Sequence, residues 1–370
     1  MFDLAQEYDD SDLVHLEIGE PDFDTPEHIV QAASDAIADG ATHYTSNAGL
    51  PTLRRAVTAD ITDDYQYDPE SQVLVTAGAM EALTLAFLTL VDPGDEVVVP
   101  TPAWPNYRTQ VEMVGGKFVG VPLDSENGYA LDSEAVVDAI SDDTGLVVLT
   151  TPSNPTGQVY DAVATDAVVA AAADHGAAVV ADEVYKHLVY EGDGRSIVDT
   201  TPHPDHVVTL GSCSKTYAMT GWRVGWFAAS PAVVEAATKF HESIVACAPT
   251  VSQYAAIEAL TGDQKSIRKM KKAFERRRDF LVERVAELPE VTCPRPDGAF
   301  YAFVDLSAVG ADSVAIAEQL LREYGVVTAP GAGFGSDAEG KLRLSFANDR
   351  ANIAEGLDRI EQFLVAEGIQ

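Results

Sequence analysis

Short apolar runs that alternate with helical segments between residues 73 and 228 constrain the fold more than any other feature. These runs are rich in β-branched residues and stand at 73–75, 96–99, 118–121, 146–149, 177–181, 206–210 and 224–228. Helical patterns such as 79–91 and 161–174 separate them. Continuous apolar runs are typical of strands that are buried on both faces. The alternation therefore predicts an α/β fold with a large, mostly parallel sheet and helices on both faces.

The pattern changes after Pro249, where long helices and a few separate strands take over. A charged helix is expected over about 264–288, and the strand at 299–305 is followed by a helix at 313–324. This part predicts a smaller α+β domain. We therefore expect three segments: 1–40 as an N-terminal arm and part of the small domain, 41–270 as the large, cofactor-binding domain, and 271–370 as the C-terminal small domain.

The chain is strongly acidic. Its 370 residues include 59 Asp and Glu against 24 Lys and Arg, which gives a formal net charge of −35. The acids are scattered, as at Asp9-Asp10, Asp63-Asp64 and Asp142-Asp143. A solvated anionic surface repels nucleic acid and anionic lipid, so we expect small-molecule partners and neither nucleic acid nor membrane. The hypothesis for this surface is halophilic adaptation to a cytoplasm of high salt concentration.

The expected location is cytoplasmic. The chain has three cysteines, Cys213, Cys247 and Cys293. A small, odd number of cysteines does not make a disulfide framework and suits a reducing interior. No secretory leader is evident, and no apolar run approaches 18 residues. No metal site is predicted either, because the pair His203 and His206 in a Pro-rich loop is more typical of a surface.

The stretch GSCSKTYAMTGWRVGW, residues 211–226, concentrates the groups that can carry chemistry. It places Lys215 among Ser212 and Ser214, and Arg223 follows eight residues later. Such a lysine can form a Schiff base with an aldehyde cofactor, while the hydroxyls and the guanidinium hold a phosphate. The alternative is a polar loop with one solvated lysine, since S-x-S-K is a short pattern.

Further candidates follow the ends of predicted strands, where open parallel sheets bind their ligands. Gly78 and Ala79 join a strand to a helix N-terminus that can receive phosphate. Asn154 lies in TPSNPTG, and Asp182 ends a buried strand. The alternatives are an ordinary turn for Asn154 and a helix cap for Asp182.

These residues together fit pyridoxal 5′-phosphate. Asp182 can keep the ring nitrogen of this cofactor protonated, and Asn154 and Tyr185 can bind its phenolic oxygen. Trp104, in TPAWPNY, can stack on the ring. Several groups of fitting chemistry thus point to one ligand.

The whole chain resembles the class I/II pyridoxal-phosphate-dependent aminotransferases of fold type I, the aspartate aminotransferase superfamily. The matching motifs, in the family's order, are YTSNAGLPTLR, TAGAMEAL, TPAWPNY, SNPTG, ADEVY, S-x-S-K with TGWRVG, DGAFY and LRLSFA. The resemblance implies an enzyme that moves an amino group between an L-amino acid and a 2-keto acid by a ping-pong mechanism.

The resemblance also assigns roles to individual positions. Lys215 matches the catalytic lysine, which holds the cofactor and moves the substrate proton. Tyr44 matches a tyrosine that reaches the phosphate in the neighbouring subunit, which implies a homodimer. The expected cofactor-binding residues are Gly78, Ala79, Met80, Trp104, Asn154, Asp182, Tyr185, Ser212, Ser214, Lys215, Arg223 and Tyr44. The expected substrate-binding residues are Gly19, Asn154 and Arg343, with Arg343 on the α-carboxylate.

The substrate and the exact reaction stay open at this point. Met80 stands where some relatives that prefer dicarboxylates carry a cation, so the preference for aspartate is in doubt. The same scaffold also supports C–S β-lyases, racemases and decarboxylases. A non-catalytic sensor is a further alternative, although it needs an attached DNA-binding module.

Overall fold

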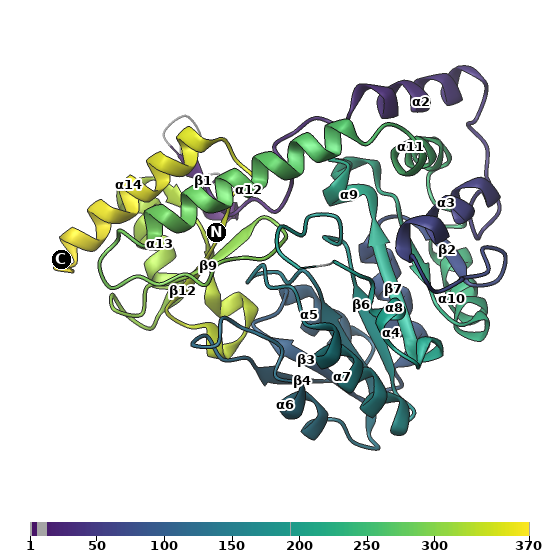
Figure 1. Cartoon of the computed structure of the whole chain (residues 1–370), viewed down its shortest axis with the longest axis horizontal. Coiled ribbons are helices and arrows are strands. Elements are labelled where there is room, and N and C mark those ends of the chain that lie inside the picture. The colour runs from purple at the N-terminus through teal and green to yellow at the C-terminus, as the bar shows by residue number, and fades with distance from the viewer. Residues whose placement is uncertain (1, 6–12, 193, 370) are drawn as a thin grey trace.

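A seven-stranded sheet forms the centre of the larger part of the molecule (Figure 1). The computed structural model of the chain describes residues 2–5, 13–192 and 194–369, so Asp9 and Asp10 of the predicted acidic arm lie outside the described residues. The strands, in spatial order, are β2 (Val73–Thr76), β8 (Gly225–Ala228), β7 (Val207–Ser212), β6 (Ala178–Asp182), β5 (Thr144–Thr150), β3 (Glu96–Thr101) and β4 (Lys117–Pro122).

Neighbouring strands of this sheet are parallel except at β8, which is antiparallel to both β2 and β7. Successive residues of a strand point to opposite faces, and both faces are apolar. In β6, for example, Val179 and Ala181 belong to one core cluster, whereas Val180 belongs to another. The predicted α/β fold with a mostly parallel sheet is therefore confirmed.

Helices cover both faces of the sheet. One face packs against α4 (Ala79–Leu90), α5 (Pro105–Met113) and α10 (Pro231–Ile244). The other face packs against α2 (Glu27–Ala38), α3 (Pro51–Ile61), α6 (Ser133–Asp138), α7 (Ala162–Asp174) and α11 (Thr250–Thr261). Helix α2 contacts α11, and its Ile29 and Ala33 are buried in the core of the large sheet.

A second core lies in the smaller part, on the left of Figure 1. Its three-stranded antiparallel sheet has the order β11 (Ala329–Pro330), β12 (Lys341–Ser345) and β9 (Tyr301–Asp305). Strand β1 (Val14–His15) pairs in parallel with β10 (Val326–Val327). The covering helices are α12 (Lys265–Val285), α13 (Ser313–Tyr324) and α14 (Arg350–Ala366). This arrangement is the α+β part that the sequence predicts.

Helix α12 connects the two cores, as Figure 1 shows. Its Ile267 joins the core of the large sheet, and its Phe274 and Leu281 join the second core. The basic run of this helix is largely exposed or paired with acids, as in the ion pair of Arg277 with Asp22. It is therefore a helix between two parts of the molecule, as the sequence indicates.

Two features of the fold go beyond the sequence prediction. Helix α10 was not expected, although Ser230-Pro231 marks its start with a proline in the first turn. Several strands also continue past their apolar residues, because polar residues at the ends still pair in the ladder, as Thr150 does with Asp182. The remaining short helices are α1 (Phe2–Ala5), α8 (Ile197–Thr200) and α9 (Cys213–Thr216).

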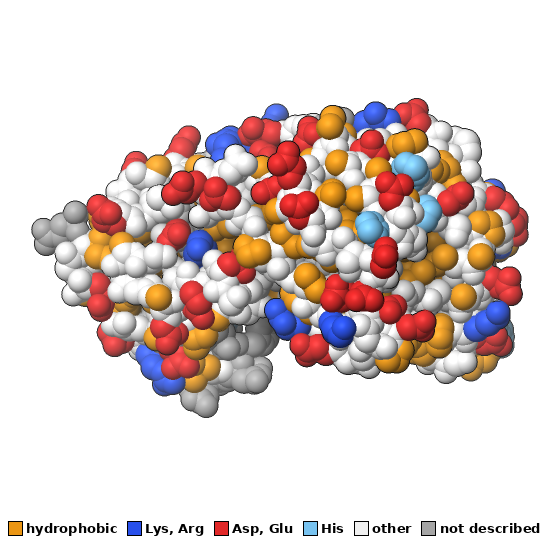
Figure 2. Space-filling view, turned by 90° about the horizontal axis from the view of Figure 1, so that it is seen from below, with side chains coloured by type: hydrophobic (Ala, Val, Ile, Leu, Met, Phe, Trp, Pro, Cys, Tyr) orange, Lys and Arg blue, Asp and Glu red, His pale blue; other side chains and the backbone are white. Residues whose placement is uncertain are grey.

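The surface is dominated by acid. Figure 2 shows Asp and Glu side chains spread over the visible face, with fewer Lys and Arg among them. Within the described part of the chain, no helix is long and apolar enough to cross a bilayer.

Candidate active site

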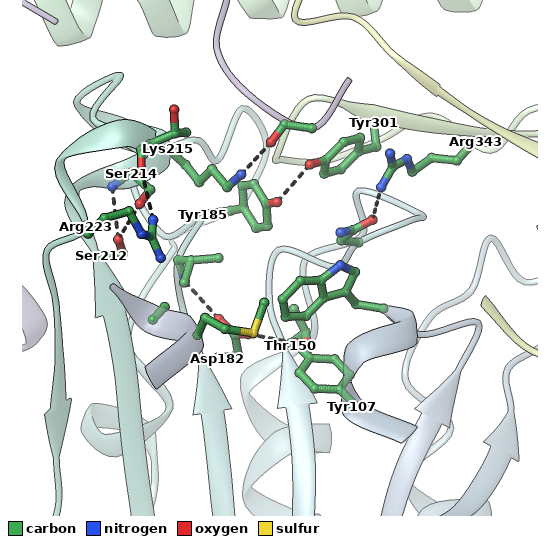
Figure 3. Close-up of a pocket in the computed structure, with 17 residues that line it drawn as sticks. Tyr107, Thr150, Asp182, Tyr185, Ser212, Ser214, Lys215, Arg223, Tyr301 and Arg343 are labelled. Atoms are coloured by element: carbon green, nitrogen blue, oxygen red, sulfur yellow. Dashed lines mark hydrogen bonds between the residues drawn. The ribbon is translucent and has the colours of Figure 1, made fainter. Parts of the chain in front are cut away.

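A cavity of about 330 Å³ lies at the carboxyl ends of the parallel strands, between the two parts of the molecule (Figure 3). Strands β5, β6 and β7 end at this cavity with Thr150, Asp182 and Ser212, and β9 and β12 contribute from the smaller part. The volume is in the range of small-molecule sites. Its lining residues are Gly19, Ala79, Met80, Trp104, Tyr107, Thr150, Asn154, Asp182, Val184, Tyr185, Ser212, Ser214, Lys215, Thr220, Arg223, Tyr301 and Arg343.

Lys215 enters the cavity from α9, directly after β7. Ser212 caps this short helix, because its side chain accepts a hydrogen bond from the Ser214 N–H at 3.0 Å. The Lys215 Nζ donates to the backbone carbonyl of Gly19, on the segment before α2. The amine therefore reaches across the cavity between the two parts of the chain (Figure 3).

Asp182 lies on the floor of the cavity and is only 5% exposed. Its Oδ2 accepts a hydrogen bond from the Tyr107 hydroxyl at 2.7 Å, and its Oδ1 accepts one from the Val184 N–H at 3.3 Å. Burial raises the pKa of Asp182, while the hydrogen bond from Tyr107 opposes that rise. None of the described basic side chains forms an ion pair with this carboxylate, so a cationic N–H group would complete its environment.

A second set of polar groups surrounds the N-terminus of α4. Gly78 has φ +85°, and a Cβ there would lie 2.5 Å from Arg223 Nη2, so only glycine fits. Arg223 itself has a left-handed backbone, with φ 52°, and donates to the carbonyls of Thr220 and Ala77 at 2.8 and 3.3 Å. The Ser212 and Ser214 hydroxyls lie 2.8 Å apart beside it. Free N–H groups, hydroxyls and a guanidinium together make an anion site.

Arg343 reaches the opposite side of the cavity from β12. It is 8% exposed, and its Nη1 and Nη2 donate to Asn154 Oδ1 at 3.1 Å and to the Glu17 carbonyl at 2.5 Å. Its Nε is buried without a hydrogen-bond partner. No carboxylate among the described residues pairs with Arg343. A buried guanidinium of this kind is complementary to the carboxylate of a ligand.

The cavity brings together nearly all of the residues that the sequence singled out. Twelve of them line it directly: Gly19, Ala79, Met80, Trp104, Asn154, Asp182, Tyr185, Ser212, Ser214, Lys215, Arg223 and Arg343. Gly78 adjoins the cavity through its contact with Arg223. Tyr44 is not among the lining residues and is 86% exposed.

Sequence reasoning missed two tyrosines that matter to the site. Tyr107 contacts Asp182, and its signal was its position three residues after Trp104, on the next turn of the same helix. Tyr301 contacts Tyr185 and was visible only as the last letter of the motif DGAFY.

Comparison with known proteins places the chain in a family. The family model described as aminotransferase class I and II matches residues 11–360. The chain belongs to this family.

Similar proteins cover almost the whole of this aminotransferase. An aspartate aminotransferase of Pyrococcus horikoshii is 37% identical over 99% of the chain and 94% of its own length. Aromatic-amino-acid aminotransferase 2 of Thermococcus litoralis is 35% identical over 98% of the chain and 94% of its own length. The solved aspartate aminotransferase of Thermus thermophilus with maleate superposes with a TM-score of 0.93 at 37% identity, and covers 98% of the chain and 94% of that structure.

These findings confirm the fold type and the reaction class. The chain is an aminotransferase of fold type I, of a family whose members use pyridoxal phosphate. They do not favour a C–S β-lyase or a sensor. The relatives differ in their amino acid, since one is named for aspartate and another for aromatic amino acids.

Proposed function

We propose that this aminotransferase binds pyridoxal 5′-phosphate on Lys215 and exchanges the amino group of an L-amino acid with a 2-keto acid by a ping-pong mechanism. One observation carries the proposal. The amine of Lys215 shares a cavity with the buried carboxylate of Asp182 and the buried guanidinium of Arg343, and neither group forms an ion pair with another described residue.

The phosphate end of the cofactor fits the polar groups at the start of α4. Arg223 would pair with the phosphate, and the Ser212 and Ser214 hydroxyls and the N–H groups after Gly78 would donate to it. Among the described residues, Arg223 donates to the Thr220 and Ala77 carbonyls, and the Ser212 hydroxyl contacts Ser214 and the Val224 carbonyl. A dianionic phosphate would therefore satisfy them.

The ring of the cofactor fits the floor and wall of the cavity. Asp182 would accept a hydrogen bond from the ring nitrogen and hold its proton there. Asn154 and Tyr185 would bind the phenolic oxygen, and Trp104 would cover the ring face. When bound, the cofactor supplies an electron sink for the charge that develops at the amino acid Cα.

Lys215 is the group assigned to proton transfer. Its Nζ lies in the cavity, donates to the Gly19 carbonyl and lies over the rings of Tyr185 and Phe300. With cofactor and substrate bound, the free amine of Lys215 would act as the general base that takes the proton from the amino acid Cα, and it would hold this proton for return to the product.

The substrate α-carboxylate is assigned to Arg343, with Asn154 and the backbone near Gly19 beside it. The cations that line the described cavity are then all used, because Lys215 and Arg223 face the cofactor. At the position where a cation could read a side-chain carboxylate stands Met80, whose sulfur accepts from the Gln110 amide. We therefore propose that this chain supplies no cation of its own to the substrate side chain.

A homodimer is part of the proposal. Tyr44 is an aromatic residue that is 86% exposed, on a segment held to α11 by hydrogen bonds from Thr250 to His43 and from Gln253 to Thr45. A rigidly anchored, exposed aromatic side chain is well suited to reach the phosphate site of a second copy. Analytical ultracentrifugation should give the mass of a dimer, and Tyr44→Ala should weaken cofactor binding without changing the fold.

The domain division and the environment are also proposed. We propose a small domain that comprises the N-terminal arm and residues 271–370. The sequence predicts the first boundary at residue 40, and we move it to about residue 26, because α2 packs in the core of the large sheet. A net charge of −35 supports a protein that needs high salt, in a cytoplasm where its cysteines stay reduced. Activity and folding should then increase from dilute buffer to molar salt.

A panel of amino donors with 2-oxoglutarate, at high salt, tests the function. We expect formation of glutamate and a family of parallel double-reciprocal lines. Release of pyruvate and ammonia without an acceptor keto acid would indicate a lyase instead. Aspartate should gain no advantage over donors of similar size that lack a side-chain carboxylate, and a strong preference for aspartate would contradict the role given to Met80.

A further inference from the structure

We infer that Tyr301 is a positioning residue that tunes Tyr185 through its hydroxyl and orients Arg343 through its ring. The inference rests on the proposed function, since it assigns Tyr185 to the phenolic oxygen of the cofactor and Arg343 to the substrate α-carboxylate. Figure 3 shows Tyr301 between these two residues.

The placement of Tyr301 is tightly defined. It is the first residue of β9 in the smaller part of the molecule and is 1% exposed, whereas Tyr185 follows β6 of the large sheet and packs its ring into the second core. The two hydroxyl oxygens lie 2.9 Å apart. A Cβ on Gly19 would lie 2.9 Å from the Tyr301 hydroxyl, so the glycine leaves the room that this hydroxyl occupies. The contact therefore joins two separate parts of the fold at the cavity wall.

The direction of the hydrogen bond follows from proton counting. A tyrosine hydroxyl carries one proton and can also accept. When Tyr185 donates its proton to the phenolic oxygen of the cofactor, the only proton left for the tyrosine pair is that of Tyr301. Tyr301 must then donate to Tyr185, and a donor whose oxygen also accepts a hydrogen bond becomes a stronger donor.

The surroundings of the pair favour the neutral form of Tyr185. Burial raises the pKa of Tyr185, as does its neighbour Tyr301. The charged groups that face Tyr185 are Arg343, Asp182 and Lys215, whose Nζ lies 6.0 Å from the Tyr185 ring centroid. Because Tyr185 stays neutral, it acts through hydrogen bonds and not through a charge of its own.

The effect on the cofactor has a predictable sign. A stronger donor at the phenolic oxygen withdraws negative charge from it, and this lowers the proton affinity of the nitrogen that links the cofactor to Lys215. Loss of the Tyr301 hydroxyl should therefore raise the pH midpoint at which the visible absorbance of the holoenzyme changes. Loss of the Tyr185 hydroxyl should raise the midpoint further, because that donor is then absent altogether.

The ring of Tyr301 has a separate task. The guanidinium carbon of Arg343 lies 4.4 Å from the Tyr301 ring centroid, in a stacked cation–π contact. This contact orients the two nitrogens that would bind the substrate carboxylate. Tyr301→Phe keeps the ring and removes the hydroxyl, whereas Tyr301→Leu removes both, so the two tasks can be separated.

The test is a spectroscopic pH titration of the holoenzyme for wild type, Tyr301→Phe, Tyr185→Phe and the double variant. We expect Tyr301→Phe to raise the midpoint by roughly half a pH unit, the scale of one neutral hydrogen bond, with KM for the amino donor unchanged. The double variant should match Tyr185→Phe, because Tyr301 acts through Tyr185. Tyr190→Phe is the matched control, since its hydroxyl bonds to the Ala299 carbonyl and not to Tyr185, and its midpoint should not move.

Three outcomes are distinguishable. An unchanged midpoint in Tyr301→Phe, or equal shifts with and without Tyr185, overturns the role of the hydroxyl while the proposed function stands. A KM in Tyr301→Leu that equals that of Tyr301→Phe overturns the role of the ring; if Tyr301→Leu does not fold, the phenylalanine variant still decides the first role. A wild-type protein that takes up pyridoxal phosphate without any visible absorbance overturns the proposed function itself.

Discussion

The two walls of the cavity are held in different ways. On the wall formed by the large sheet, polar groups are fixed by neighbours in that sheet, in the helices that follow its strands and in the adjoining loops. Asp182 is held by Tyr107 and by the Val184 N–H, and Ser212 is held by Ser214 and the Val224 carbonyl. None of these contacts involves the smaller part of the molecule.

On the facing wall, the polar groups are fixed by contacts that cross the cavity. Arg343 donates to Asn154, and Tyr301 contacts Tyr185. Lys215 reaches in the reverse direction, to the Gly19 carbonyl. Arg343 and Lys215 would change partners when a ligand binds beside them, whereas the contact of Tyr301 with Tyr185 would be kept.

This difference suggests that one wall serves to bind the cofactor and the other to bind the substrate. A preorganised wall suits a cofactor that stays bound, since no rearrangement is needed to receive it. A wall whose partners can be exchanged suits substrates that must enter and leave. Changes on the sheet wall should therefore affect the cofactor, and a change at Arg343 on the facing wall should affect the substrate.

Lys215, the one residue that belongs to both walls, should give the largest effect. Lys215→Ala is expected to lower kcat by at least about 10⁴-fold, since the base at Cα is lost. Lys239→Ala is the matched control, because this exposed lysine lies outside the cavity and pairs with Glu235 at i,i+4. Steady-state kinetics of both variants, with circular dichroism to check folding, make the measurement. If kcat of Lys215→Ala were within tenfold of the wild-type value, Lys215 could not be the base that acts at Cα.

Asp182→Asn tests the sheet wall. The change keeps shape and removes the charge that holds the proton on the ring nitrogen, so we expect kcat to fall on the order of 10³-fold and the Kd for pyridoxal phosphate to rise. Kinetics and fluorescence titration with the cofactor check this. Glu183→Gln is the control, because the neighbouring carboxylate points away from the cavity to Ser196 and the Ile197 N–H. Equal losses in the two variants would count against the assignment.

Arg343→Lys tests the facing wall. A lysine keeps the charge but cannot bind a carboxylate with two parallel hydrogen bonds, so KM for the amino donor should rise roughly 10- to 100-fold. The Kd for pyridoxal phosphate should stay at the wild-type value. Arg322→Lys, at an exposed helical position that pairs with Glu318, should change neither quantity. If Arg343→Lys weakened cofactor binding and left KM unchanged, the assignment of Arg343 to the substrate would be wrong.

Substitution of Glu183 should give the smallest effect, because it should change the pH dependence of stability and leave catalysis unchanged. Burial raises the pKa of Glu183 to about 7 from an ordinary value of 4.5, although Lys186 opposes the rise. Between these values the folded protein holds the proton and the unfolded chain does not, so stability falls as pH rises to about 7. Glu183→Gln has no such charge. The free energy of unfolding of Glu183→Gln minus that of wild type should therefore rise by roughly 2 kcal/mol between pH 5 and pH 8.

Urea denaturation of the cofactor-free protein at the two pH values, at constant salt, measures this difference. Asp263→Asn is a useful control, since that carboxylate is exposed and its pKa is lowered by hydrogen bonds to Lys265. A Glu183→Gln variant that tracks wild type at both pH values would show that Glu183 is not a source of pH-dependent stability.

The sheet wall was largely predictable from the sequence because its residues sit at strand ends. Asp182 directly follows an apolar strand, and Asn154 comes four residues after Thr150, so the rule for parallel sheets places both at one edge. The antiparallel direction of β8 was not predictable, because an apolar run carries no information about strand direction.

The facing wall was less predictable because its contacts join distant segments. Tyr301 and Tyr185 are 116 residues apart, and Arg343 and Asn154 are 189 apart. No local pattern encodes such contacts, since they depend on how the smaller part packs on the sheet. Resemblance to the family supplied Arg343, but it gave no role to Tyr301.

Reduction of the holoenzyme with borohydride, followed by digestion and peptide mass mapping, tests the central claim most directly. The account predicts one modified peptide that carries the reduced cofactor on Lys215, and none in protein treated without pyridoxal phosphate. Attachment to another lysine such as Lys186, or no attachment in a protein that has taken up the cofactor, would contradict it.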